Sequence, residues 1–168
     1  YHPMSQGIAV EGMKLVIANL PKAYADGTDI DARANMMCAA AMGATAFQKG
    51  LGAIHALSHP IGAMHHTHHG TTNAVCMPAV LKLNASAIRD RFDAVSGYLG
   101  VAGGFAGFCA FVDEFNAGLG IPKTLTELGV RDPDMDRLVR NALKDPSCGG
   151  NPITLTEANT RALFEAVL

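Results

Sequence analysis

Histidine is concentrated in one short stretch of this chain. Six of its seven histidines lie between residues 55 and 69, in the segment GAIHALSHPIGAMHHTHHG. Asp, Glu, Lys and Arg are absent from residues 50–81, so the histidines stand among Ala, Gly, Leu, Ile and Met. Neutral imidazole is the commonest metal ligand in proteins, and an uncharged background is typical of an interior or a cleft wall. The stretch therefore predicts a metal site.

The spacing of three histidines favours a shared site. His55 and His59 are four residues apart, so they project from the same face of a helix, one turn from each other. Pro60 is expected to cut or bend this helix, because proline lacks a backbone donor. A turn after it would bring His69 back beside His55. The segment contains no carboxylate, so we expect a complete site to recruit ligands from elsewhere.

Alternative roles remain open for each histidine. His55 and His69 are either ligands or buried histidines that bond to backbone groups. His59 is either functional or a structural cap where the helix meets the proline. Three others, His65, His66 and His68, line a substrate or cofactor cleft, support the ligands without binding the ion, or belong to the turn itself, since neighbouring side chains cannot all face one ion. Ser58 has no acidic partner or elbow motif, which disfavours a nucleophile.

Helical periodicity predicts the elements that hold these histidines. The helix Met4–Asn19 is expected to end at Pro21. Asp29 is expected to cap a second helix that runs toward Gln48. After the helix that carries His55 and His59, we expect further helices at three places: Gly70–Asn84, kinked or restarted at Pro78; Ala85–Tyr98; and Phe105–Leu119.

Capping patterns indicate three more helix starts. Thr124 with Glu127 and Thr154 with Glu157 both have the spacing of a capping box. Asp132 precedes a proline in the arrangement of an N-cap followed by the first helical position. No segment shows the alternation expected of a strand. The fold class predicted is an all-α multi-helix bundle, organised as one domain over residues 1–168.

Composition disfavours several partners. The net charge of −2 and the pI near 6.4 give no electrostatic basis for binding nucleic acid or an anionic membrane. The uncharged run Ala94–Val112 approaches the length of a membrane span, but its glycines favour tight helix packing. Four cysteines occur without a C-x-x-C pair, so we expect small buried side chains of a reduced cytoplasmic protein rather than a disulfide.

The histidine stretch is part of a longer pattern. It reads Gly52-x-x-His55-x-x-x-His59-x-x-Gly62-x-x-x-x-x-x-His69-Gly70, followed by Asn73, Pro78 and Asn84. This pattern resembles the signature of the iron-containing (group III) alcohol dehydrogenases, and the similarity runs from YHPMSQGIAVEGMKLV to Asn151-Pro152. The resemblance implies the helical C-terminal domain of that family, with its dehydroquinate synthase-like fold. It also implies that His55 and His69 are metal ligands. His59 would lie near the nicotinamide and the substrate, for proton transfer or positioning.

The resemblance also implies that parts of the site are absent from this chain. Family members carry a nucleotide-binding domain before the helical one, and two further ligands, an aspartate and a histidine, upstream of the position of Tyr1. No G-x-G-x-x-G motif or βαβ unit occurs here. His2 falls after the family's ligand position, so it is not a candidate. The lack of an initiating Met favours a fragment.

The implied function is reversible hydride transfer between a small alcohol or aldehyde and NAD or NADP. A divalent metal would act as Lewis acid on the substrate oxygen; iron is favoured and zinc is the alternative. The isolated chain is expected to be inactive, because the nucleotide-binding domain and half of the ligands are missing. Helical faces left uncovered would favour a homo-oligomer. The alternative function is a non-enzymatic helical module for metal binding or subunit contact.

Overall fold

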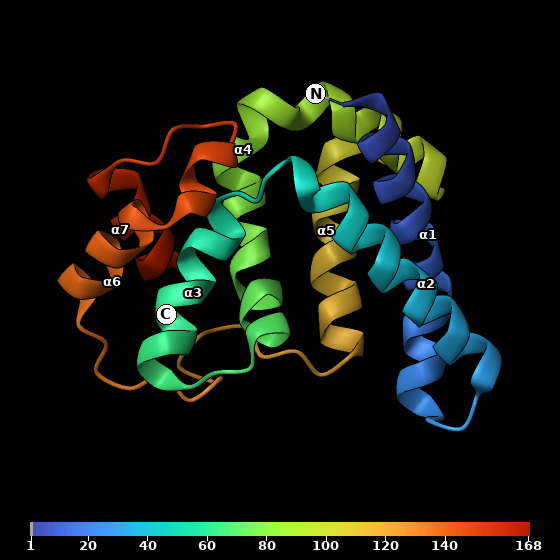
Figure 1. Cartoon of the computed structure of the whole chain (residues 1–168), viewed down its shortest axis with the longest axis horizontal. Helices are drawn as coiled ribbons and strands as arrows, with labels where there is room; N and C mark the ends of the chain where they lie inside the picture. Colours follow the sequence, from blue (N-terminus) through green and yellow to red (C-terminus); the bar gives the residue numbers. More distant parts are fainter. Residues whose placement is uncertain (1) are drawn as a thin grey trace. The chain divides into compact units, whose positions relative to one another are not determined.

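The computed structural model describes residues 2–168, which form helices and contain no strand. This confirms the predicted all-α class. The α-helices are α1 (Pro3–Ala25), α2 (Ile30–Ala46), α3 (Ala53–His65), α4 (His69–Leu99), α5 (Gly104–Gly118), α6 (Met135–Lys144) and α7 (Glu157–Val167), and two short 3-10 helices are η1 (Phe47–Lys49) and η2 (Pro146–Gly150) (Figure 1).

The helices group into two compact units. Unit 1 contains the residues up to Lys49 together with Asp90–Phe108, and unit 2 contains Gly50–Arg89 together with Cys109–Leu168. The histidine-rich stretch and everything that contacts it, as described below, belong to unit 2.

Unit 1 is built on the pair α1 and α2, which lie side by side (Figure 1). Small residues allow the two helices to approach closely: a Cβ atom on Gly12 would lie 3.5 Å from the Cβ of Met42. As predicted, Asp29 caps α2, and its carboxylate accepts a hydrogen bond from the Ala32 amide at 2.9 Å.

Unit 2 has the larger apolar core. Its helix α3 contacts α6 and η2, and α6 contacts α7. Burial of the apolar faces of these helices is the main contribution to the stability of unit 2. The buried residues at its centre are Ala53, Leu57, Ile61, Val75, Cys76, Val80, Leu125, Val130, Leu138, Val139, Ala142, Leu163, Phe164 and Val167.

Prolines interrupt the helices less than predicted. Pro21 lies inside α1, which continues to Ala25, so the predicted end at this proline is wrong. In the last turn it forfeits a single backbone hydrogen bond, and the helix closes when the Asp26 amide donates to the Lys22 carbonyl. Pro60 does not cut α3, and Pro78 lies inside α4.

The predicted break after Asn84 is also wrong. Residues 69–99 form the single helix α4. No Gly or Pro occurs between Pro78 and Gly97, so nothing in the backbone ends the helix there. The predicted helix Phe105–Leu119 agrees with α5 to within one residue at each end.

Neither of the two predicted capping boxes starts a helix at its predicted position. Thr124 and Glu127 make the expected bonds, from the Glu127 amide to the Thr124 hydroxyl at 3.1 Å and from the Lys123 amide to the Glu127 carboxylate at 2.8 Å. They close only a turn, because Gly129 follows with a φ of +103°. The box before α7 uses Thr156 with Asn159, not Thr154 with Glu157.

The third predicted start is displaced by two residues. Asp134, rather than Asp132, caps α6 and accepts a hydrogen bond from the Arg137 amide at 3.0 Å. Asp132 has a φ of 41°, a left-handed conformation that does not lead into a helix. Both aspartates fit the N-cap pattern in the sequence, and the backbone conformation determines which of them caps the helix.

The cysteines are all free thiols, and only one matches the expected burial. Burial raises the pKa of the Cys76 thiol to about 12, so this residue acts as a small apolar side chain. Cys38 is exposed, and Cys109 and Cys148 are half-buried.

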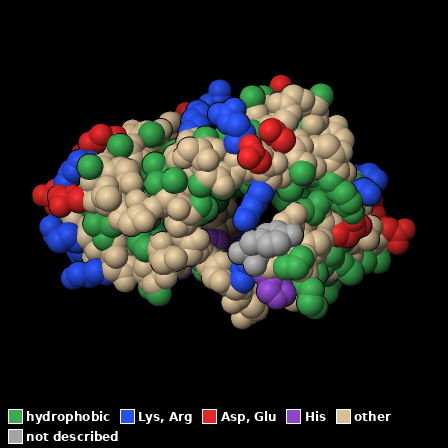
Figure 2. Space-filling view, turned by 90° about the horizontal axis from the view of Figure 1, so that it is seen from above, with side chains coloured by type: hydrophobic (Ala, Val, Ile, Leu, Met, Phe, Trp, Pro, Cys, Tyr) green, Lys and Arg blue, Asp and Glu red, His purple; other side chains and the backbone are tan. Residues whose placement is uncertain are grey.

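The surface carries mixed charges. On the face in Figure 2, Lys and Arg side chains lie beside Asp and Glu side chains rather than in a patch of one sign. No single helix among residues 2–168 has the length and apolar character to cross a membrane; α4 and α5 meet that test only as a bent pair.

Gly150 packs closely against the backbone just before α3. A Cβ atom at this position would clash with the carbonyl oxygen of Leu51, whereas a Cβ atom on Gly149 would meet nothing within 4 Å. We expect Gly150→Ala to lower the free energy of unfolding by about 3 kcal/mol, measured by urea denaturation. Gly149→Ala is the matched control, and an equal effect of both substitutions would contradict this account.

Candidate metal and catalytic site

The start of α3 is held by a side chain distant in the sequence. Its N-cap residue, Gly52, has no side chain, and the first free amide, of Ala53, instead donates to Asn151 Oδ1 at 3.1 Å. The Asn151 amide is also paired with Asn84 of α4, through bonds of 2.9 and 2.8 Å in opposite directions. These bonds fix the start of α3 against α4, and so fix where His55 stands relative to α4.

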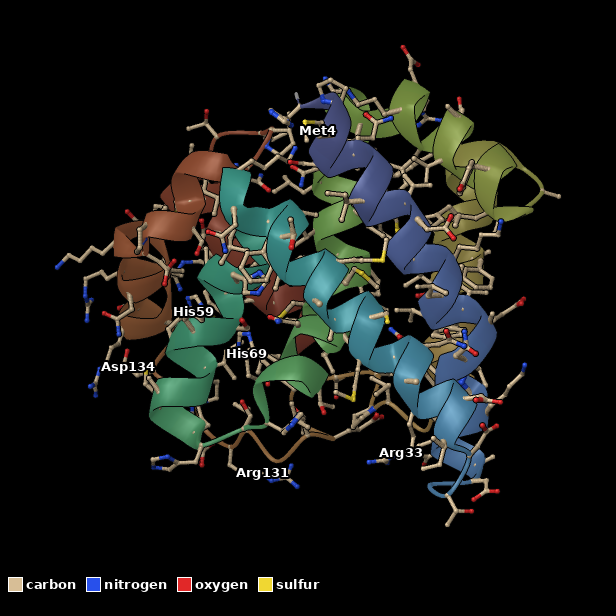
Figure 3. The ribbon with its side chains drawn as sticks, turned by 45° about the vertical axis from the view of Figure 1, so that its right-hand side comes forward. Met4, Arg33, His59, His69, Arg131 and Asp134 are labelled. Carbon is tan, nitrogen blue, oxygen red and sulfur yellow. The ribbon has the colours of Figure 1, made fainter. Side chains whose placement is uncertain are left out.

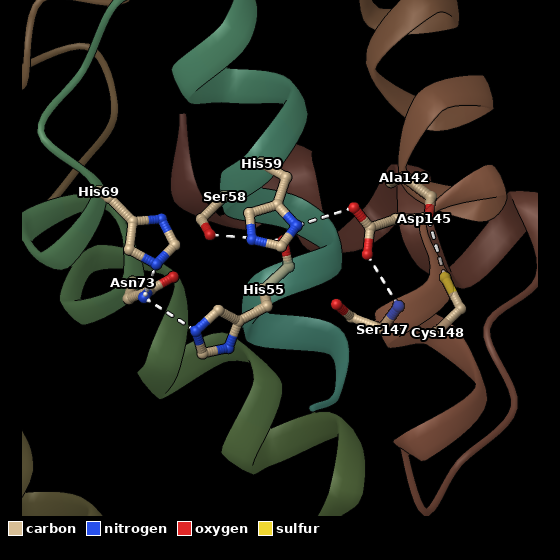
Figure 4. A network of polar contacts seen from close by, with 9 residues as sticks. All are labelled: His55, Ser58, His59, His69, Asn73, Ala142, Asp145, Ser147 and Cys148. Carbon is tan, nitrogen blue, oxygen red and sulfur yellow. Dashed lines mark hydrogen bonds and ion pairs between the residues drawn. The ribbon is translucent and has the colours of Figure 1, made fainter. Parts of the chain in front are cut away.

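The structure brings three of the histidines together. His55 and His59 belong to α3, and His69 is the first residue of α4. Figure 3 labels His59 and His69, and the close-up in Figure 4 includes His55. The ring centroids are 5.6 Å apart for His55 and His59, 5.3 Å for His55 and His69, and 5.5 Å for His59 and His69. We call these three residues the histidine cluster.

Two rings of the cluster direct the same atom at one point. Nε2 of His69 is 3.1 Å from the amide nitrogen of Asn73, and Nε2 of His55 is 3.4 Å from that same nitrogen (Figure 4). Both Nε2 atoms therefore lie within 3.4 Å of a single polar atom. Two imidazoles that bind one metal ion likewise direct their lone pairs at one point.

The third ring is paired with a carboxylate. His59 Nδ1 lies 2.8 Å from Asp145 Oδ2, with the His59 side chain 41% exposed and the Asp145 side chain 13% exposed (Figure 4). When Nδ1–H donates to the carboxylate, Nε2 of His59 keeps its lone pair. His59 is thus a proton acceptor, and the more buried Asp145 fixes the orientation of its ring.

Asp145 stays ionised in this position. Partial burial on its own would raise the pKa of its carboxyl, but hydrogen bonds from Ser147 and from His59 outweigh burial and lower that pKa. The Ser147 amide donates to Asp145 Oδ1 at 2.8 Å, because Asp145 ends α6 and caps η2. A local cap therefore also orients the carboxylate toward His59.

His55 is held in its neutral form. Burial lowers the pKa of its imidazole, and the neighbouring His69 and His59 lower it further, while Asp145 has a smaller opposite effect. A neutral ring keeps the lone pair that a metal ion requires.

The remaining histidines of the stretch lie at the end of α3 and in the turn that follows it: His65 is the last residue of α3, and His66 and His68 precede α4. His66 ends α3 with a φ of 55°, and its amide donates to the Gly62 carbonyl at 2.9 Å. His68 accepts the Thr71 amide at 3.3 Å and so caps the first turn of α4. His65 has a buried Nε2 atom without a hydrogen-bond partner in the described part of the chain.

The donor set fits part of a metal site. His55 and His69 each offer an Nε2 lone pair toward one point, as imidazole ligands of iron or zinc do. Within residues 2–168, however, no group of three or more His, Cys, Asp or Glu side chains is placed to hold an ion. These residues fit a metal whose other ligands come from outside them.

A cavity in unit 2 is separate from the histidine cluster. It has a volume of about 560 Å³, is bordered mostly by apolar side chains of α4, α5 and α7, and contains no histidine in its lining. It is therefore not the candidate site.

Sequence reasoning did not find Asp145. It lies 86 residues from His59, and its only local signal is that of a helix cap. Three asparagines of the site, Asn73, Asn84 and Asn151, were part of the sequence pattern but had no assigned role. Asn84 and Asn151 bond partners on other elements, and so does Asn73 through His55, so spacing along one helix could not reveal these contacts. The contact of Asn73 with His69 follows the four-residue spacing within α4.

Comparison with known families identifies the chain. Residues 1–168 match the C-terminal part of the Fe-containing alcohol dehydrogenase family. The chain belongs to this family, and it is the all-α C-terminal domain, which confirms the resemblance seen in the sequence.

Similar proteins agree with this assignment. The chain is 38% identical to 4-hydroxybutyrate dehydrogenase of Cupriavidus necator over 98% of its length, and 36% identical to NAD-dependent methanol dehydrogenase of Bacillus methanolicus over 99%. It spans only 45% and 46% of those proteins. The crystal structure of a 1,3-propanediol oxidoreductase superposes with a TM-score of 0.93 at 28% identity, over 99% of this chain and 46% of that one.

The contact between His59 and Asp145 is expected to make stability depend on pH. A carboxyl whose pKa is lowered by folding stabilises the protein above its ordinary pKa, and this contribution is lost as the pH falls through the lowered value. We expect Asp145→Asn to reduce the free energy of unfolding at pH 7 by about 1 kcal/mol, and the difference from wild type to shrink as the pH falls below about 4 toward the lowered pKa of Asp145. Urea denaturation across this pH range measures it.

Asp113→Asn is the control for that experiment, because Asp113 is an exposed carboxylate on α5. We expect it to change stability by less than about 0.5 kcal/mol. A difference between wild type and Asp145→Asn that stayed constant from neutral to acidic pH would contradict the account.

Proposed function

We propose that this chain is the metal-binding, catalytic half of an NAD(P)-dependent alcohol dehydrogenase, which transfers hydride between a small alcohol or aldehyde and the nicotinamide. The observation that carries the proposal is the convergence of His55 Nε2 and His69 Nε2 on one point, in a chain of the Fe-containing alcohol dehydrogenase family. The names of its relatives, a 4-hydroxybutyrate dehydrogenase and an NAD-dependent methanol dehydrogenase, support this reaction type.

His55 and His69 are the proposed metal ligands of this chain. When bound, the ion acts as a Lewis acid toward the substrate oxygen. Iron is favoured by the family, and zinc is the alternative because imidazoles accept either. The two histidines would supply two ligands of the ion, and the other ligands would come from outside this chain.

His59 is the proposed proton-transfer residue. Oxidation of an alcohol to an aldehyde releases a hydride, which goes to the nicotinamide, and the hydroxyl proton, which needs an acceptor. Nε2 of His59 is such an acceptor, because Asp145 bonds the opposite nitrogen at 2.8 Å and stabilises the ring once it is charged. A ring at this place also contacts and orients the nicotinamide.

The chain is proposed to be inactive alone. It spans about 45% of its relatives, and the nucleotide-binding domain is proposed to lie in the remainder. The uncharged wall of residues 50–81 would then help to keep water from the reacting groups. We place the whole protein in the cytoplasm, where thiols such as Cys76 stay reduced.

Self-association is the second part of the proposal. All the large exposed apolar side chains among the described residues belong to unit 1: Met4, Tyr24, Ile30, Met37, Phe47 and Tyr98. Met37 and Ile30 are 75% and 72% exposed. Six large apolar side chains exposed to water support a contact of this surface with another copy of the chain or with the proposed nucleotide-binding domain.

The test is metal content and NAD(P)-linked alcohol oxidation of the full-length protein. His55→Ala and His69→Ala are expected to lower metal affinity at least about tenfold and to abolish turnover. His59→Gln is expected to keep the metal and lower kcat by about 10²- to 10⁴-fold. His2→Ala is the matched control, because His2 caps the exposed start of α1.

Two results separate the alternatives. Retention of metal and of wild-type kcat in both His55→Ala and His69→Ala would refute the proposed site. A full-length protein that binds metal but oxidises none of methanol, 1,3-propanediol and 4-hydroxybutyrate, with either NAD or NADP, would favour the non-enzymatic module.

A further inference from the structure

Asn73 links the two candidate ligands. It lies four residues after His69 on α4, so its side chain projects from the same face of the helix. Its amide nitrogen is 3.1 Å from His69 Nε2 and 3.4 Å from His55 Nε2. A primary amide has two N–H groups, so one nitrogen can donate to both rings at once.

The direction of these hydrogen bonds determines which nitrogen of each ring carries the proton. A ring nitrogen that accepts a hydrogen bond carries a lone pair, and in a neutral imidazole the proton is then on Nδ1. His55 and His69 are therefore both held with the Nε2 lone pair facing Asn73. Those are the lone pairs that a shared cation would bind.

The oxygen of the same amide has no partner. Oδ1 of Asn73 is buried and accepts no hydrogen bond from residues 2–168. Buried amide oxygens are nearly always hydrogen-bonded, so this orientation of the side chain is not maintained by its oxygen. The contacts with the two imidazoles are what hold the amide in place.

We infer that Asn73 is a positioning residue, which holds His55 and His69 with both Nε2 atoms directed at one point and so prepares them for a shared metal ion. The inference rests on the proposed function. It matters most for His69, whose side chain is exposed at the start of α4. A ring already held in place loses less conformational freedom when the ion binds.

The first test is the Zn²⁺ affinity of the full-length protein, measured by competition with a chromogenic chelator. Asn73→Ala is expected to weaken binding about tenfold. Asn73→Asp keeps the shape and places an anionic oxygen beside both rings, so it is expected to bind Zn²⁺ more tightly than wild type. Opposite effects of the two variants cannot come from a general loss of folding.

Asn116→Ala is the matched control. Asn116 is also half-buried, and its amide donates to the Ala74 carbonyl at 3.3 Å without contacting the histidine cluster. Its Zn²⁺ affinity should equal that of wild type. Equal affinities for wild type, Asn73→Ala and Asn116→Ala would overturn the inference.

The second test needs no metal. In the metal-free protein with ¹⁵N-labelled histidine at about pH 8, NMR is expected to show the Nδ1–H tautomer for His55 and His69, assigned with the His→Ala variants. Asn73→Ala should shift both rings toward the Nε2–H tautomer. Unchanged tautomers in Asn73→Ala would overturn the inference. A wild-type protein that binds no Zn²⁺ would refute the proposed function instead, and the tautomer measurement would still test the role of Asn73.

Discussion

The side chain of Asn151 is the constraint on which the candidate site depends. It caps α3 through the Ala53 amide, pairs with Asn84 of α4, and donates to the Ile153 carbonyl at 2.7 Å. These bonds join the start of α3, the middle of α4 and the segment before α7. Because His55 lies two residues after Ala53 and His69 begins α4, a change in this junction would move the two candidate ligands relative to each other.

The three rings of the histidine cluster have two different kinds of polar partner. His55 and His69 turn their Nε2 atoms toward Asn73, and His59 turns its Nδ1 atom toward Asp145. Neighbouring imidazoles would repel one another if they were charged, and the lowered pKa of His55 keeps that ring neutral. Two candidate ligands and one carboxylate-paired imidazole thus lie with their ring centroids 5.3 to 5.6 Å apart. In the proposed site, the ion and ligands from outside the chain would supply the remaining charge.

The class of fold and the histidine cluster could be predicted from the sequence. Helical periodicity, the Asp29 cap and the four-residue spacing of His55 and His59 are local signals, and the structure contains the helices that they indicate. The pairing of His59 with Asp145 could not be predicted, because it depends on how α3 packs against the end of α6. Prolines 21, 60 and 78 were poor guides to helix ends, since packing of the flanking turns compensates for one lost hydrogen bond.

The most direct measurement is anomalous diffraction at the metal absorption edge from crystals of the full-length protein. The account predicts one peak at about 2.1 Å from Nε2 of both His55 and His69, with further ligands from outside residues 2–168. A peak bonded to only one of these rings, or rings whose Nε2 atoms face different regions in the metal-loaded protein, would contradict it.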